Sequence, residues 1–253
     1  MNIRETRVEN AGSEGVPRMT RDEAELCVPI HRATYPSLLI LDDGSDQTGE
    51  PVRIRKSSIE IGRSQGDLEF PAERLMSSQH CKIELQELES GVWGWVLTDL
   101  DSRHGLFVRV ESFVAKPGMQ FLCGGSKFSV GGPASSLTSA DLKTGYTPFV
   151  DKANASCELI IDCYSVAQQS TSVKLRQSLV IGNEFRDDGC PVKDPFVDYQ
   201  HATMTRMSDN EWRVTDNESL NGIWLRVKSV QLDETRAFLA GEQRFLFQPG
   251  FGN

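Results

Sequence analysis

The sequence predicts an all-β protein built as two tandem antiparallel β-sandwiches joined by a short linker. Three observations lead to this fold class. Short apolar runs with period-two alternation recur from Tyr35 onward, and polar turn residues separate them. The same order of runs returns about 120 residues downstream. Between the two series lies a stretch that is rich in Gly, Pro, Ser and Thr and lacks the alternation.

The first series of strands occupies residues 35–132. Turns such as Asp42–Ser45, or a glycine such as Gly62, end the apolar runs. Many short strands with polar turns are typical of a sandwich or a barrel. The predicted strands are Ser37–Leu41, Val52–Arg55, Ser58–Ile61, Cys81–Leu85, Val92–Leu97, Leu106–Val110 and Lys127–Val130.

The second series occupies residues 156–253 and repeats the first. The matched blocks are Cys157–Ile161 with Ser37–Leu41, Ser178–Gly182 with Ser58–Gly62, Gln200–Met204 with Gln79–Ile83, Trp212–Asp216 with Trp95–Asp99, and Ser219–Trp224 with Ser102–Phe107. The offset is 120 from Gly62 to Gly182, 121 from His80 to His201, and 117 from Gly105 to Gly222. Five blocks in the same order indicate an internal duplication.

Two segments lie outside the repeats. Residues 1–34 are polar and show no sustained period, which predicts a mobile N-terminal tail. Residues 133–155 have the composition of a linker. The predicted order is therefore tail, first domain (35–132), linker, and second domain (156–253).

Composition and charge exclude several classes of function. The net charge of −9 argues against nucleic acid as a partner, since duplex binding depends on Lys and Arg contacts to phosphates. No run approaches the roughly 18 apolar residues of a membrane helix, and the N-terminus lacks an apolar secretory core. We therefore expect a cytoplasmic protein without a membrane partner. The six Cys residues form no CxxC pair, so we expect buried thiols, with no metal and no cofactor.

Three polar clusters follow strands of the first series and suit one phosphoryl group. Arg63 comes directly after the glycine that ends a strand, and an arginine can bind phosphate through two hydrogen bonds. The hydroxyl groups of Ser77 and Ser78 add donors. Gly105 allows a tight turn after Ser102. The clusters contain no nucleophile, base and orienting group in order, so we expect no enzyme activity.

These residues resemble the signature of the forkhead-associated (FHA) domain. The signature combines Gly-Arg, a Ser-x-x-His some fifteen residues later, and Ser-x-Asn-Gly before a strand. Residues 35–132 resemble the family along most of their length, and residues 156–253 resemble a degenerate copy. The resemblance implies two FHA-like sandwiches, whose end loops bind phosphothreonine peptides in this family.

The resemblance also implies roles for the residues of the first copy. Arg63 would hold the phosphate, Ser77 would hydrogen-bond it, and Ser78 would lie near it. His80 would brace the loops, together with the framework glycines Gly62 and Gly105.

His104 departs from the family pattern, which has Asn at this position to hold the peptide backbone. An imidazole cannot copy the paired donor and acceptor of an amide, although His104 still lies where it could contact a peptide. The neighbouring Arg103 could add positive charge.

The second copy keeps the framework residues but loses the charges. Gly182, His201, Asn221 and Gly222 retain the motif, whereas Asn183 stands at the Arg63 position. Asp198 stands at the Ser77 position, and a carboxylate there repels phosphate. We expect this copy not to bind phosphate.

Two functions follow from the sequence. The first is a non-catalytic adaptor in Ser/Thr kinase signalling, which binds a phosphothreonine-containing protein through its first domain. The partner would be a Ser/Thr kinase or its substrate. The alternative is a phosphate-independent interaction scaffold that uses both sandwiches.

Overall fold

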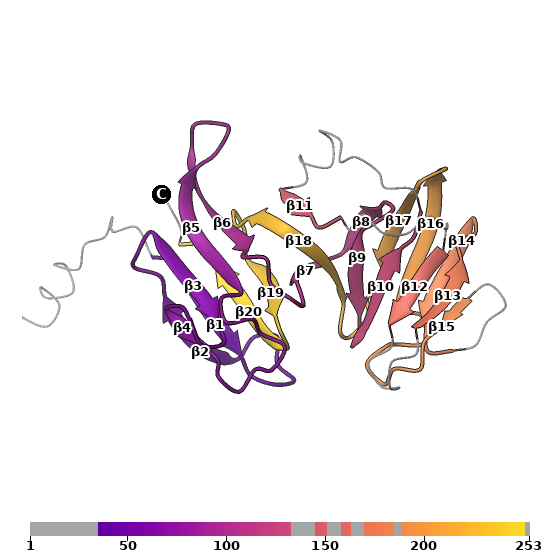
Figure 1. Cartoon of the computed structure of the whole chain (residues 1–253), viewed down its shortest axis with the longest axis horizontal. Helices are drawn as coiled ribbons and strands as arrows, with labels where there is room; N and C mark the ends of the chain where they lie inside the picture. The colour runs from indigo at the N-terminus through magenta and orange to yellow at the C-terminus, as the bar shows by residue number, and fades with distance from the viewer. Residues whose placement is uncertain (1–34, 133–144, 151–157, 163–169, 185–188, 251–253) are drawn as a thin grey trace, which may run out of the picture. The chain divides into compact units, whose positions relative to one another are not determined.

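The computed structural model describes residues 35–132, 145–150, 158–162, 170–184 and 189–250. In this part of the chain the regular structure is all strand, which confirms the predicted all-β fold class (Figure 1). Among these residues no helix is long and apolar enough to cross a membrane. The predicted tail, residues 1–34, lies outside the described residues, as do 133–144 and 151–155 of the predicted linker.

Most strands are short, and the first repeat contributes ten of them. They are β1 (Ser37–Leu41), β2 (Gly49–Arg53), β3 (Ser58–Gly62), β4 (Leu68–Glu69), β5 (Cys81–Glu87), β6 (Trp93–Asp99), β7 (Leu106–Val110), β8 (Ser112–Ala115), β9 (Gln120–Cys123) and β10 (Ser126–Val130). Within the predicted linker, β11 (Tyr146–Pro148) pairs with β18.

The second repeat contributes the remaining strands in the corresponding order. They are β12 (Glu158–Asp162), β13 (Ser170–Lys174), β14 (Ser178–Gly182), β15 (Gly189–Pro191), β16 (Ala202–Ser208), β17 (Glu211–Asp216), β18 (Ile223–Gln231), β19 (Arg236–Ala240) and β20 (Gln243–Gln248).

The first sandwich consists of two sheets. One has the order β2–β1–β20–β19–β7, and the other has the order β4–β3–β5–β6–β18; because β18 pairs with β6, β7 and β9, both are parts of one 15-stranded sheet that extends into the second sandwich. Phe70, directly after β4, packs edge-on against Phe245 of β20 with a centroid distance of 5.4 Å. This aromatic pair joins the two sheets and places the core between them.

The second sandwich has the same construction. Its sheets have the orders β13–β12–β10–β9–β18 and β15–β14–β16–β17–β8. Phe113 of β8 packs against Phe121 of β9 at 5.4 Å, again across the two sheets. The stacked pair Phe121–Phe128, at 5.0 Å, has its counterpart in the pair Phe238–Phe245, at 4.9 Å. The duplicated sequence therefore builds two equivalent cores.

The last strands of each repeat complete the sandwich of the other repeat. β1 pairs with β20, so that Leu38 lies opposite Phe247, and β12 pairs with β10, so that Leu159 lies opposite Val130. Likewise β8 pairs with β17, and the end of β18 pairs with β6. The sandwiches therefore differ from the contiguous domains 35–132 and 156–253 that the sequence repeat predicts, because each combines strands from both.

The cause of this exchange is visible in two short segments. Val108–Phe113 reads VRVESF and Leu225–Val230 reads LRVKSV, and neither contains Gly, Pro, Asn or Asp. Without turn residues the chain does not fold back on itself: β18 runs through the second segment, and only a bend at Glu111 separates β7 from β8 in the first. Within β18, residues Ile223–Leu225 pair with β9, and residues Ser229–Gln231 pair with β6. One uninterrupted strand therefore serves both sandwiches.

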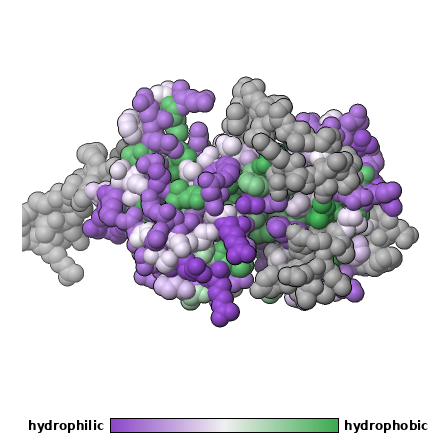
Figure 2. Space-filling view, in the orientation of Figure 1, coloured by the Kyte–Doolittle hydropathy of each residue, from purple (hydrophilic) through white to green (hydrophobic). Residues whose placement is uncertain are grey.

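The apolar residues that face inward are well buried, and polar residues dominate much of the surface on the face drawn in Figure 2. The cysteines among the described residues, Cys81, Cys123 and Cys190, are buried, which confirms the expected burial for these three.

Candidate functional site

Backbone hydrogen bonds join the loop after β3 to the loop before β5. The Arg63 N–H donates to the Ser77 carbonyl at 2.8 Å, and the Gln65 N–H donates to the Ser78 carbonyl at 3.0 Å. A Cβ atom at Gly62 would lie 2.1 Å from the Ser78 carbonyl oxygen, so no larger residue fits at this position. The close contact of the two loops places Arg63 beside the two serines.

The Ser77 side chain joins this pair of loops to the β6–β7 loop. Its hydroxyl oxygen accepts a hydrogen bond from the Arg103 N–H at 2.9 Å. A hydroxyl that accepts in this way keeps its own proton for donation to a further group. Ser77 thus has a fixed position at the junction of three loops, together with the Arg63 backbone, Ser78 and Arg103.

His80 is fully buried beneath the junction. Its Nδ1 accepts the Ser77 N–H at 3.1 Å, so the proton lies on Nε2, which donates to the Gly105 carbonyl at 3.1 Å. Burial lowers the pKa of His80, and this effect outweighs the hydrogen bond to Gly105, which raises it. His80 therefore stays neutral and connects two loops from inside.

The β6–β7 loop ends in a turn that requires glycine. Gly105 has a φ of +93°, and its N–H donates to the Ser102 hydroxyl at 3.1 Å. The Ser102 hydroxyl in turn donates to the Asp99 carboxylate. This turn directs Arg103 and His104 outward, and both side chains are exposed.

His104 lies among basic groups. Its pKa is lowered, first by partial burial and then by the positive charges of Arg103, Lys127 and Arg226. Lys127 belongs to β10 and Arg226 belongs to β18, so the basic groups around His104 include residues of the exchanged strands. A phosphate near His104 would enter a positive local field.

Sequence reasoning missed Arg226 and Lys228, which come from the second repeat. A Cβ atom at Gly105 would lie 2.2 Å from Arg226 Nε, which shows how closely this side chain approaches the loop. Arg226 donates to the Gln120 amide at 2.7 Å and lies 3.7 Å above the Phe149 ring.

Lys228 forms ion pairs with two carboxylates at the β6–β7 loop. Its ammonium group lies 2.6 Å from Asp101 and 3.6 Å from Asp99, and its hydrogen bond lowers the pKa of Asp101. The repeat aligns Lys228 with Glu111 and Arg226 with Arg109. Alignment alone therefore gave no reason to place either residue beside the first site. Only the missing turns in the segments Val108–Phe113 and Leu225–Val230 could have done so.

The second repeat builds the same framework. The Asn183 N–H donates to the Asp198 carbonyl at 3.0 Å. His201, fully buried, accepts the Asp198 N–H at Nδ1 over 3.2 Å and contacts the Gly222 carbonyl through Nε2 over 2.9 Å. Gly222 has a φ of +69° and, like Gly105, donates its N–H to a serine hydroxyl, that of Ser219.

The polar side chains of the second framework are bonded within the framework. The Asp198 carboxylate accepts the Leu220 N–H at 2.7 Å, at the position where Ser77 accepts the Arg103 N–H. Asn183 donates its amide to the Val197 carbonyl at 2.6 Å, and Asn221 donates to the Phe196 carbonyl at 2.8 Å. These amides thus tie the loops together, and the group at the Ser77 position is an anion.

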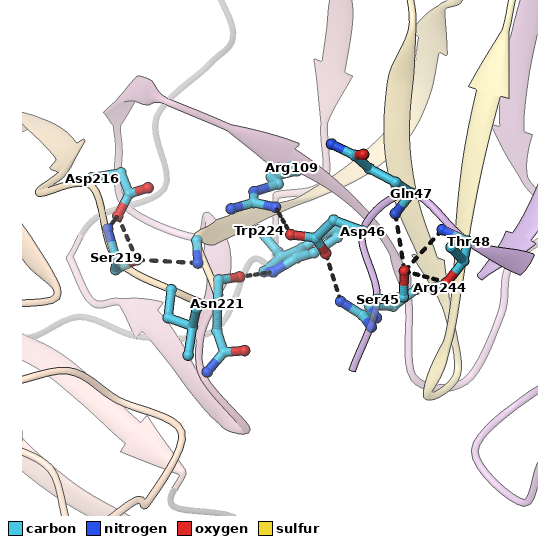
Figure 3. Close-up of polar contacts among 12 residues, drawn as sticks. Ser45, Asp46, Gln47, Thr48, Arg109, Asp216, Ser219, Asn221, Trp224 and Arg244 are labelled. Atoms are coloured by element: carbon cyan, nitrogen blue, oxygen red, sulfur yellow. Dashed lines mark hydrogen bonds and ion pairs between the residues drawn. The ribbon is translucent and has the colours of Figure 1, made fainter. Parts of the chain in front are cut away.

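Figure 3 shows the surroundings of this second loop. Asp216 accepts from Ser219, and the Trp224 indole N–H donates to the Asn221 carbonyl at 2.8 Å. Nearby, Asp46 binds both Arg109, at 3.2 Å, and Arg244, at 2.8 Å. Arg109 is the counterpart of Arg226, and here a carboxylate offsets its charge. The first and second loops therefore differ in charge as well as in side chains.

Comparison with known proteins agrees with the two frameworks. The FHA domain family model matches residues 59–121 and again residues 179–241. A search of curated proteins finds none that matches this chain. Both matches include the buried histidine and the glycine turn described above. The chain therefore carries two tandem FHA domains and belongs to the FHA domain family.

Proposed function

We propose that this protein is a non-catalytic adaptor that binds a phosphothreonine-containing protein at the loops of the first sandwich. FHA domains generally mediate phosphothreonine-dependent protein interactions. One observation carries the assignment to this end of the molecule. The Ser77 hydroxyl is fixed by the Arg103 N–H, and the Ser77 carbonyl is fixed by the Arg63 N–H. A hydroxyl donor therefore lies beside an exposed arginine.

The chemistry of this arrangement fits a phosphate dianion. The Arg63 guanidinium supplies charge and paired donors, and Ser77 supplies a donor whose orientation is fixed in advance. Ser78, Arg103 and His104 border the same loops and would contact the residues around the phosphothreonine. Binding requires no reaction of the phosphate, and the proposed role in the cytoplasm is to recruit a Ser/Thr kinase or its substrate.

A binding titration tests the proposal. Full-length protein is titrated with a library of phosphothreonine peptides and with the same peptides lacking phosphate. We expect phosphate-dependent binding that Arg63→Ala weakens by about tenfold to a hundredfold, because a charged hydrogen-bond partner is lost. Asn183→Ala, at the matched position of the second repeat, is the control and should leave the affinity unchanged.

Two results would contradict the proposal. The first is equal binding of phosphorylated and unphosphorylated peptides by the wild-type protein. The second is equal loss of affinity in the Arg63 and Asn183 variants, which would place the phosphate elsewhere.

The alternative is a phosphate-independent scaffold that uses both sandwiches. The anionic loop end of the second repeat, with Asp198 at the Ser77 position, is the observation in its favour. An interaction that survives both Arg63→Ala and phosphatase treatment of the partner would support this alternative.

A further inference from the structure

Large apolar side chains are exposed at the loop end of the second sandwich. Phe196, Tyr199 and Leu220 have exposed fractions of 54%, 73% and 78%. They account for three of the seven large hydrophobic residues that are exposed in the described part of the chain. We call these three side chains and Asp198 the acidic–apolar surface. A cluster of this kind on loops is typical of an interaction site.

Hydrogen bonds bring these residues together. Asn221, next to Leu220, donates to the Phe196 carbonyl at 2.8 Å, while the Leu220 N–H donates to Asp198 at 2.7 Å. Tyr199 directly follows Asp198 in the sequence. The two loops that carry the acidic–apolar surface are thus joined at two points.

A buried carboxylate anchors the same loop from beneath. Asp194, which is 3% exposed, accepts hydrogen bonds from the Phe196 N–H at 2.8 Å and from the Ser126 hydroxyl at 2.6 Å. The loop is therefore fixed to the β9–β10 turn. Apolar side chains on an ordered backbone lose little conformational entropy when a partner covers them.

The first sandwich has different residues at the equivalent positions. The sequence offsets align Phe196 with Leu75, Tyr199 with Ser78, and Leu220 with Arg103. Two polar or basic positions of the first site are thus large and apolar in the second. The acidic–apolar surface differs from the first site in chemistry while it keeps the same framework.

The charge of the surrounding loops indicates the sign of the partner. The described loop segments 183–184, 192–200 and 217–222 contain four acidic residues and one basic residue. The matched segments of the first repeat, 63–64, 71–79 and 100–105, contain two acidic and three basic residues. Acidic loops repel phosphate and attract Lys and Arg.

We infer that the acidic–apolar surface binds an unphosphorylated segment of a partner protein in which a large apolar side chain lies next to Lys or Arg. The apolar side chain would be covered by Phe196, Tyr199 and Leu220, and the cation would pair with Asp198. Contacts of this type combine an apolar centre with a charged rim. This binding is independent of the phosphothreonine site of the first sandwich, so either proposal can fail alone.

Selection from a phage-displayed library of random, unphosphorylated short peptides tests the inference. Full-length protein is the bait, and selected peptides are synthesised for titration. We expect peptides that contain Leu, Ile or Phe beside Lys or Arg. Leu220→Ser and Tyr199→Ser should each weaken their binding by about tenfold, as expected for residues at the centre of an interface. Asp198→Asn keeps an acceptor for the Leu220 N–H and should weaken binding by lowering the negative charge.

Two matched controls define the site. Trp93→Ser removes an apolar side chain that is 64% exposed on β6 and should have no effect. Arg63→Ala should also have no effect on this binding, whereas it should weaken phosphopeptide binding by about tenfold to a hundredfold if the proposed function is correct.

Several outcomes would overturn the inference. They are the absence of any selected peptide, selection of acidic peptides, and equal loss of binding in Trp93→Ser and Leu220→Ser. Self-association of the chain that Leu220→Ser abolishes would assign the surface to a second copy, and this result would overturn the inference as well.

Discussion

The Asp198 carboxylate accepts a hydrogen bond from the Leu220 N–H at 2.7 Å. In the first repeat the equivalent N–H belongs to Arg103, and the Ser77 hydroxyl accepts it at 2.9 Å. Both loop pairs are therefore joined in the same way. A hydroxyl keeps a proton that it can donate to phosphate, whereas a carboxylate at the same place repels phosphate.

The double substitution Asn183→Arg with Asp198→Ser should create phosphate binding in the second repeat. It supplies the charge and the hydroxyl of the first site on a framework that already contains His201 and Gly222. We expect weak binding of inorganic phosphate, with a Kd on the order of millimolar, because one small anion makes few contacts. The measurement is the shift of the Leu220 and Gly222 amide resonances during a phosphate titration.

The single variant Asn183→Arg is the control for this experiment, since it keeps the repelling carboxylate. If it bound phosphate as well as the double variant does, Asp198 would not be what prevents binding at this end.

The substitution His80→Ala should lower the free energy of unfolding by about 2–4 kcal/mol. It removes a fully buried side chain and leaves the Ser77 N–H and the Gly105 carbonyl without their partner. Urea unfolding followed by circular dichroism measures the loss. The exposed histidine of the β6–β7 loop provides the control, since His104→Ala should change stability by less than about 0.5 kcal/mol. Similar losses in both variants would contradict a bracing role for His80.

Stability should also fall in mild acid, for the same reason. Burial lowers the pKa of His80 in the folded state, while the unfolded chain takes up the proton near the ordinary value of about 6.5. Unfolding therefore binds a proton below that pH, so the contribution of neutral His80 is fully present above about pH 6.5. It is lost progressively as the pH falls from there toward the lowered pKa. Unfolding curves over this range should show a smaller dependence on pH in His80→Gln, and an unchanged dependence would contradict the assignment.

Phosphopeptide binding should raise the pKa of His104. In the free protein this pKa is lowered by partial burial and by the charges of Arg103, Lys127 and Arg226. A phosphate offsets those charges and favours the protonated ring, so binding takes up a proton and is favoured by a lower pH. As the pH falls from about 8 to about 6.5, the affinity of the wild-type protein for phosphopeptide should rise more than that of His104→Asn. This range lies above the second pKa of the phosphate, so the phosphate keeps its charge. Titration of the His104 ring by NMR, with and without peptide, measures the shift, and an unchanged pKa would place the phosphate away from this ring.

Much of the fold and of the candidate site could be predicted because local patterns specify them. Alternating apolar residues predicted the strands, and the spacing from Gly62 through His80 to Gly105 predicted which loops would meet. The exchange of strands could not be predicted from the repeat, because the last strands of the two repeats are equivalent. The sequence pattern is the same whether these strands pair within their own repeat or with the other repeat. Arg226 and Lys228 reach the first site only through that exchange. The roles of His104 and of the loops of the second sandwich depend on the charge and exposure of their side chains. The spacing of residues in the sequence does not predict these properties.

The strand exchange makes the two repeats depend on each other for folding. β1 requires β20 as its neighbour, and β12 requires β10. A fragment that ends at residue 155 lacks β18, β19 and β20, and a fragment that begins at residue 156 lacks β8, β9 and β10. Each fragment would leave sheet edges and apolar core residues exposed. We therefore expect both fragments to be unfolded or aggregated when they are produced alone, and to form a one-to-one complex when they are produced together.

Size-exclusion chromatography, circular dichroism and phosphopeptide titration of the separate and combined fragments measure this outcome. The combined fragments should recover the affinity of the intact chain. A fragment of residues 35–132 that folds alone as a monomer and binds phosphopeptide would show that the strands pair within the repeat.

The control is the same fragment with an Asn-Gly turn inserted between Glu111 and Ser112. That turn supplies the reversal that the segment VRVESF lacks, so β8, β9 and β10 can fold back onto their own repeat. If the missing turn causes the exchange, the fragment with the insertion should fold alone while the fragment without it does not.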